Sequence, residues 1–127
     1  MNNLYLGKKG EEIAAKYLQK TGYQILQRNF KCKLGEIDII ALDPSTSSGQ
    51  SLQTLVFIEV KTRWSKKFGL PEEAVTPWKI RSIVKTGEYF KMLHPQLPDS
   101  LRIDVVAISI SSNNNIEEIK LLKNITG

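Results

Sequence analysis

The sequence predicts an α/β or α+β protein with one central sheet, its elements running in the order αβββαβ with a further strand at the end. Two segments with helical periodicity and five strand-like segments indicate this class. With 127 residues, 41% of them hydrophobic and 24% charged, the chain is expected to form one globular domain, residues 1–127. No apolar run approaches the ~20 residues of a membrane-spanning helix, so we expect no membrane partner.

The first helix is predicted over Gly7–Lys20, because apolar residues recur there at helical spacing. Gly22 is a natural stop for this helix. Within it, Glu11 lies three residues before Ala14 and seven before Leu18. These spacings place the Glu11 side chain along the buried face of the helix.

Three strands follow, at Tyr23–Phe30, Glu36–Leu42 and Leu55–Thr62. The last two are joined by Pro44–Thr54, a segment rich in Ser, Thr, Gly and Gln, which predicts an antiparallel hairpin with a long connection. After the third strand, Trp64–Pro71 reads as a basic loop punctuated by glycine and proline.

The second helix is predicted to begin at Pro77, where the missing N–H costs nothing, with Thr76 as its N-cap. Its apolar face is expected to hold Ile80, Ile83, Val84, Gly87 and Phe90. Basic side chains are expected to leave this face toward solvent, namely Lys79, Arg81 and Lys85. Two further strands are predicted at Leu101–Ile110 and Ile116–Leu122.

Charge is unevenly distributed along a chain whose net charge is +5. An acidic stretch, residues 36–59, lies between two basic stretches, residues 1–35 and 60–95. A basic surface attracts the phosphates of nucleic acid, although uneven composition alone explains the pattern equally well. The single cysteine, Cys32, and the single histidine, His94, argue against a disulfide framework, a His-based zinc site and a serine-type triad. They favour a cytoplasmic protein.

The chemistry-bearing pattern consists of carboxylates inside apolar strands, Asp38 in EIDII and Glu59 in FIEVK. If their strands are hairpin neighbours, the two carboxylates lie close enough to share a divalent cation. Lys61 shares a strand face with Glu59, and Arg63 continues that face. Two carboxylates, an ammonium and a guanidinium suit phosphodiester hydrolysis assisted by a metal.

Structural roles remain open for the same residues. Glu59 and Lys61 could form a surface ion pair, and Asp38 could cap a turn. Asp104 in RIDVV is either a further site residue or an ion-pair partner of Arg102 or Lys61. Glu36 shares a strand face with Asp38 and is a secondary candidate.

Several motifs together resemble the bacterial YraN family. In chain order they are GEEIA at Gly10–Ala14, GYQILQRNF at Gly22–Phe30, GEIDII at Gly35–Ile40, FIEVKTR at Phe57–Arg63, FG at Phe68–Gly69 and RIDVV at Arg102–Val106. That family resembles the Holliday-junction resolvases and the restriction-endonuclease-like PD-(D/E)xK superfamily. The resemblance implies an α/β fold with a restriction-endonuclease-like αβββαβ core, a mixed central sheet flanked by helices, a divalent metal and DNA as substrate.

Carried over by position, the resemblance makes Asp38 and Glu59 the motif acids and Lys61 the motif lysine. It makes Glu11 the acidic residue of the first helix that completes the catalytic set. The expected metal ligands are Asp38, Glu59 and the backbone carbonyl of Val60, holding Mg²⁺ or Mn²⁺.

We therefore expect a metal-dependent DNA endonuclease, one that acts on branched DNA. Basic residues are expected to contact the DNA backbone, namely Arg63, Lys66, Lys67, Lys79, Arg81 and Lys85. Two symmetric incisions in a junction would favour a homodimer. The alternatives are a non-catalytic nucleic-acid-binding or adaptor module that keeps the nuclease fold, and an enzyme that acts on RNA.

Overall fold

The computed structural model describes residues 3–44, 53–64, 75–111, 113 and 115–126. Their helices and strands are, in chain order, α1 (Asn3–Lys20), β1 (Gln24–Cys32), β2 (Gly35–Asp43), β3 (Thr54–Trp64), α2 (Pro77–Leu93), β4 (Arg102–Ile110) and β5 (Ile116–Leu122). The predicted order, αβββαβ with one further strand, is confirmed. Among these residues, no helix is both long and apolar enough to cross a membrane.

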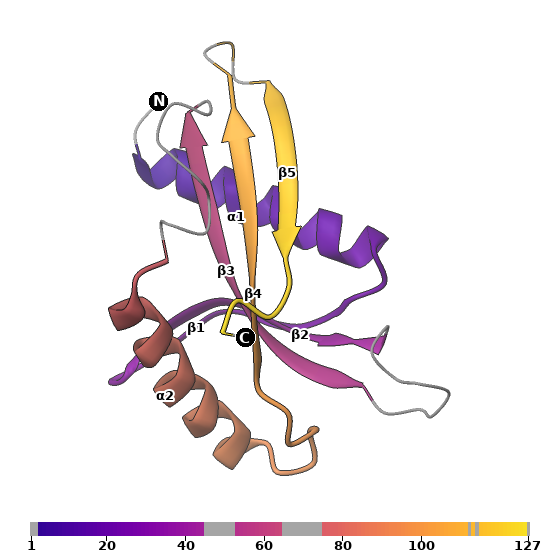
Figure 1. Cartoon of the computed structure of the whole chain (residues 1–127), viewed down its shortest axis with the longest axis vertical. Coiled ribbons are helices and arrows are strands. Elements are labelled where there is room, and N and C mark those ends of the chain that lie inside the picture. The colour runs from indigo at the N-terminus through magenta and orange to yellow at the C-terminus, as the bar shows by residue number, and fades with distance from the viewer. Residues whose placement is uncertain (1–2, 45–52, 65–74, 112, 114, 127) are drawn as a thin grey trace.

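The five strands form one mixed sheet in the order β1-β2-β3-β4-β5 (Figure 1). Strands β3 and β4 are parallel, and the connection between them contains α2. All other neighbouring pairs are antiparallel, including the predicted hairpin of β2 and β3. This is the mixed central sheet flanked by helices of a restriction-endonuclease-like α/β core.

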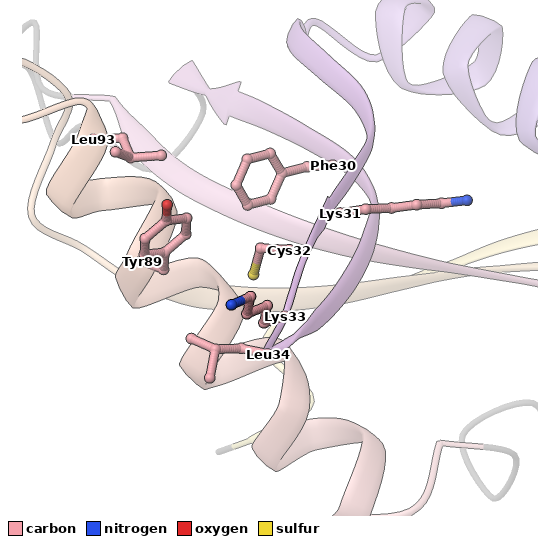
Figure 2. Close-up of a pocket in the computed structure, with 7 residues that line it drawn as sticks. All are labelled: Phe30, Lys31, Cys32, Lys33, Leu34, Tyr89 and Leu93. Carbon is pink, nitrogen blue, oxygen red and sulfur yellow. The ribbon is translucent and has the colours of Figure 1, made fainter.

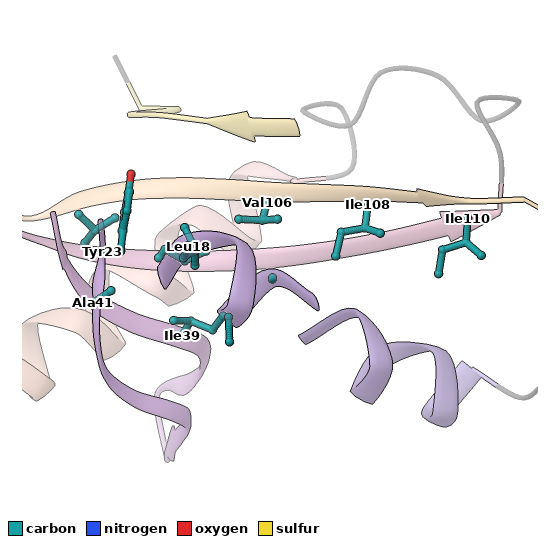
Figure 3. Close-up of a cluster of buried hydrophobic side chains, with 11 residues drawn as sticks. Leu18, Tyr23, Ile39, Ala41, Val106, Ile108 and Ile110 are labelled. Carbon is teal, nitrogen blue, oxygen red and sulfur yellow. The ribbon is translucent and has the colours of Figure 1, made fainter. Parts of the chain in front are cut away.

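The two helices pack on opposite faces of the sheet, because alternate residues of each strand point to opposite sides. On one face, Leu18 of α1 packs among buried residues that include Ile39 and Val106. Figure 3 shows Val106, Ile108 and Ile110 pointing from β4 toward α1. The chain therefore has one apolar layer between α1 and the sheet.

On the other face, Phe90 of α2 packs edge-to-face on Phe57 of β3, with ring centroids 6.3 Å apart. Thr76 caps α2 as predicted, since its hydroxyl accepts a hydrogen bond from the Lys79 N–H at 3.2 Å. Pro77 occupies the start of the helix. These local signals set where α2 begins and thus where its first turn meets the sheet.

Element boundaries differ from the predicted ones by one or two residues at most strands and by four at the start of α1. Helix α1 starts four residues before Gly7, because a glycine inside a helix costs only about 1 kcal/mol and does not stop it. Strand β1 continues to Cys32, which pairs with Gly35 across a two-residue turn. Gly35 has a φ of 150°, and a Cβ there would collide with the Ser82 side chain of α2. The turn can therefore lie close against α2.

Candidate active site

A pocket of about 340 Å³ opens where β2 and β3 face the N-terminal halves of both helices. Most of its lining residues are charged, and together they are Gly7, Glu11, Glu36, Asp38, Glu59, Val60, Lys61, Thr62 and Lys79. The residues come from four elements, α1, β2, β3 and α2. Four carboxyl groups and two ammonium groups therefore meet in one small space.

Asp38 reaches this pocket from the end of the β2–β3 pairing. The antiparallel register brings Ile39 opposite Ile58, so that Asp38 and Glu59 are the next residues along each strand. Asp38 Oδ2 accepts a hydrogen bond from the Val60 N–H at 2.8 Å. Burial raises the pKa of Asp38, and the hydrogen bond from Val60 opposes that rise. One oxygen of Asp38 is thus tied to β3.

Glu59 is the most deeply buried charged group of the pocket, with 5% of the residue exposed. Its Oε2 atom is buried and accepts no hydrogen bond from the described residues. The nearest ammonium groups lie at ion-pair distance only, Lys61 Nζ at 3.9 Å from Oε1 and Lys79 Nζ at 3.8 Å from Oε2. Burial, and then the negative charge of Asp38, raise the pKa of Glu59 to about 7. An unsatisfied buried carboxylate oxygen is costly unless a cation or donor meets it.

These features fit a divalent cation. Mg²⁺ is usually bound through one or two carboxylates, with water and substrate phosphate completing its coordination. Asp38 and Glu59 would supply the carboxylates, and the Oε2 atom of Glu59, which accepts no hydrogen bond from the described residues, is a ready ligand atom. Within the described ranges no group of three or more Asp, Glu, His or Cys side chains is arranged to hold a metal, so water, backbone or phosphate oxygens would have to complete the coordination. Val60 lines the same pocket, and ligation by its carbonyl stays a prediction.

Glu11 reaches the pocket from α1 because that helix lies very close to β3. A Cβ on Gly10 would collide with the Thr62 side chain, so only glycine permits this approach. Burial and the charge of Asp38 raise the pKa of Glu11, while a hydrogen bond with the Asn29 side chain lowers it. The structure thus places Glu11 beside the two strand carboxylates, on the side predicted from helical spacing.

The expectation that Lys79 points to solvent is wrong. Its side chain is about one-third exposed and lines the pocket beside Glu59. Lys79 lies four and eleven residues before the buried Ile83 and Phe90, so it shares their helix face. That spacing was visible in the sequence and could have located this second lysine of the site.

Among the described residues, the basic candidates Arg63, Arg81 and Lys85 do not line the pocket. Arg63 is at the far end of β3, partly buried, and does not line the pocket. Arg81 and Lys85 are exposed on α2. Lys66 and Lys67 lie outside the described residues. Their predicted contacts with DNA stay predictions.

Asp104 does not belong to this pocket. It is fully buried on the α1 side, where it accepts hydrogen bonds from Arg102 and from the Tyr23 hydroxyl at 2.9 Å. Arg102 also pairs with the buried Asp43 at 2.7 Å. These bonds satisfy two buried carboxylates with one guanidinium. Of the two interpretations left open for Asp104, the ion pair with Arg102 is the one the structure shows.

A larger hollow, of about 580 Å³, lies between the β1–β2 turn and α2 (Figure 2). Phe30, Cys32 and Tyr89 border it, whereas the Lys31 side chain points away from the helix. None of the described residues that line this hollow is a carboxylate. It therefore lacks the acid–acid–lysine set, in spite of its greater volume.

Comparison with known proteins assigns the chain to a family. The sequence profile of a family described as Uncharacterised protein family UPF0102 matches residues 10–108. The chain belongs to the UPF0102 family, which is the YraN family that its motifs resemble. The matched range contains every pocket residue except Gly7.

Curated relatives of this UPF0102 chain match over nearly their whole length. A UPF0102 protein of Caldicellulosiruptor saccharolyticus is 45% identical over 124 residues, covering 98% of both chains. One of Caldicellulosiruptor bescii is 47% identical, covering 97% of this chain and 98% of that protein. One of Desulforamulus reducens is 40% identical, covering 94% of this chain and 93% of that protein.

Proposed function

We propose that this UPF0102 protein is a metal-dependent nuclease of the cytoplasm that hydrolyses phosphodiester bonds in DNA. One observation carries the proposal. Asp38 and the buried Glu59 meet Lys61 in a single pocket, where an oxygen of Glu59 has no hydrogen-bond donor among the described residues. A binding module would not need buried carboxylates, which repel phosphate and destabilise the fold unless a cation joins them.

Asp38, Glu59 and the carbonyl of Val60 would hold Mg²⁺ or Mn²⁺. When bound, the metal would supply positive charge that offsets the phosphate and favours a water molecule as nucleophile. The hydrogen bond from the Val60 N–H orients Asp38, so its second oxygen is left for the cation. Burial favours the protonated form of Glu59. A bound cation would oppose this effect and favour the ionised form, which is the form that binds metal.

The two lysines and Glu11 supply the remaining chemistry. Lys61 would hold the attacking water and stabilise the negative charge that grows on the phosphate. Lys79, which lies 3.8 Å from Glu59 Oε2, would turn to a phosphate oxygen once a cation neutralises that carboxylate. The raised pKa of Glu11 makes its carboxylate a better proton acceptor toward water at the pocket mouth.

Further basic residues would hold the substrate. Arg81 and Lys85, exposed on α2, would track the DNA backbone with Arg63 of β3 and with Lys66 and Lys67, which follow β3 in the sequence. Branched DNA, cut in two symmetric places, is the substrate that the family resemblance favours, and two incisions would require a homodimer.

The test is a cleavage assay on branched, duplex and single-stranded DNA and on RNA, with Mg²⁺, Mn²⁺ or EDTA. Asp38→Asn should lose both Mn²⁺ binding and cleavage. Lys61→Ala should keep Mn²⁺ affinity, measured by calorimetry, and lose about 10²–10³ in rate, as expected for one electrostatic donor. Lys20→Ala, at the exposed end of α1, is the matched lysine control and should cleave like the parent.

Two results would overturn the proposal. If the parent binds DNA in EDTA and no metal induces cleavage, the protein is an adaptor. If Lys61→Ala cleaves as fast as the parent, the lysine has no role in the reaction. Cleavage of RNA but not of DNA would show that the enzyme acts on RNA.

A further inference from the structure

Trp78 is the most exposed of the large hydrophobic residues in the described part of the chain. It sits in the first turn of α2 with 75% of the residue in contact with solvent. A tryptophan carries the largest apolar surface of any side chain, and folding has left most of this one uncovered. An exposed indole offers a flat aromatic face to a ligand.

The Trp78 ring is already held by a cation. The guanidinium carbon of Arg81 lies 4.3 Å from the ring centroid, within the range of a cation–π contact. Arg81 is three residues further along the helix and therefore adjacent on its surface. The guanidinium covers one side of the indole and restrains its rotamer, while the exposure of the residue leaves the other side to solvent.

Trp78 belongs to an exposed, positively charged stripe. Trp78, Arg81 and Lys85 occupy positions i, i+3 and i+7 of α2, and all three are exposed. The stripe presents an aromatic face, one guanidinium and one ammonium, with no carboxylate among the three. It suits a ligand that combines a flat ring with negative charge.

The stripe adjoins the carboxylate pocket through the next residue of the helix. Lys79 follows Trp78 directly, and its ammonium reaches Glu59 Oε2 at 3.8 Å. In the first turn of α2, Lys79 thus lines the pocket, and Trp78 lies on the exposed stripe. A DNA strand with its scissile phosphate in the pocket would place a neighbouring nucleotide against Trp78.

We propose that Trp78 stacks on an unpaired nucleobase of a DNA strand whose phosphates contact Arg81 and Lys85. In a duplex both faces of a base are covered by its neighbours, so only an unpaired base can offer a face to the indole. This inference rests on the proposed function and narrows its substrate to DNA with a single-stranded segment beside the cut. A base with its phosphate satisfies the ring and the cations together, which favours it over a purely apolar protein partner.

The binding test is run in EDTA, so that it does not depend on cleavage. The chain has two tryptophans, and Trp64→Phe leaves Trp78 as the only indole reporter. Its fluorescence should be quenched by single-stranded DNA and much less by a duplex of the same sequence. Trp78→Ala should weaken single-strand binding by about 5-fold to 150-fold, the range measured for one base–aromatic stack, and leave duplex binding nearly unchanged.

Two further variants separate stacking from charge and from general surface change. Trp78→Phe keeps an aromatic face and should recover most of the single-strand affinity. Met92→Ala removes another exposed apolar side chain, 68% exposed near the other end of α2, and should change nothing.

The inference is overturned if Trp78→Ala weakens single-strand and duplex binding equally, or if no single-strand binding is found. It is also overturned if Trp78→Ala leaves DNA binding intact and lowers the sedimentation coefficient, because the indole would then be a contact between two copies. Quenching without any metal-dependent cleavage would leave the stacking site standing and refute the nuclease. If the protein cleaves gapped or flapped DNA and Trp78→Ala does not alter that cleavage, the nuclease proposal stands and the stacking site is refuted.

Discussion

Replacing Glu59 by glutamine tests the electrostatic basis of the pocket in the absence of metal. Glu59 is 5% exposed and has two ammonium groups nearby, at 3.8 and 3.9 Å, which do not hydrogen-bond to it. Burial and the neighbouring Asp38 nevertheless raise its pKa from 4.5 to about 7. Glutamine keeps the size of the side chain and removes its titration.

The sign of the effect follows from proton binding. Between pH 4.5 and 7 the native protein holds a proton on Glu59 that the unfolded chain has lost. The free energy of unfolding therefore falls as the pH rises through this window. The proton on Glu59 makes its full contribution to that free energy only below pH 4.5. At ~1.4 kcal/mol per pH unit, the gap between the two pKa values amounts to about 3 kcal/mol.

The assay is urea denaturation in EDTA at pH values from 5 to 8. As the pH rises across this range, the free energy of unfolding of the parent should fall by up to about 3 kcal/mol more than that of Glu59→Gln. Glu117→Gln, an exposed substitution on β5, is the control and should follow the parent. At pH 8, Mn²⁺ should stabilise the parent and leave Glu59→Gln almost unaffected. Equal pH slopes in the parent and Glu59→Gln would refute the argument that Glu59 is held in an unfavourable ionised state.

Two further predictions concern the packing of α1 on β3 and the buried charge cluster around Arg102. Gly10→Ala should destabilise the protein by up to about 2 kcal/mol, because overpacking against Thr62 costs ~1–3 kcal/mol while the helix gains only ~1 kcal/mol. Gly7→Ala, where a Cβ meets open space, should stabilise by about 0.5–1 kcal/mol, and equal urea midpoints for the two variants would contradict the close contact. Arg102→Met should cost about 3–5 kcal/mol in urea denaturation, because two buried carboxylates lose their guanidinium, and a loss below 1 kcal/mol would show that the cluster does not stabilise the fold.

Local signals predicted the elements of this chain well. The cap formed by Thr76 and the start at Pro77 depend on backbone groups only a few residues away, so they could be recognised without the rest of the fold. The apolar, Ile-rich segments around Asp38 and Glu59 identified neighbouring strands for the same reason. Boundaries were less predictable, as Gly7 inside α1 shows, because one unfavourable residue is outweighed by the rest of a helix.

The carboxylate pair and its lysine could also be derived from strand geometry. Glu59 and Lys61 share a strand face because side chains alternate, and the antiparallel register of β2 and β3 brings Asp38 beside them. Lys79 was misplaced, although its spacing from Ile83 and Phe90 indicated the inner face of α2. Asp104 looked equivalent to the site carboxylates in the sequence and proved to be an ion-pair partner of Arg102.

By itself, the sequence determined the element order, the helix cap, the family and which strand residues share a face, since all of these follow from neighbouring residues or from shared motifs. Only the tertiary structure decided which distant charges meet. Glu11 and Lys79 line the same pocket as Glu59 because both helices contact β3, and the exposure of Trp78 depends on what the fold leaves uncovered. The degree of burial that raises the pKa of Glu59 to about 7 likewise depends on the packing of four elements. Burial and long-range proximity are properties of the whole chain, and no local pattern encodes them.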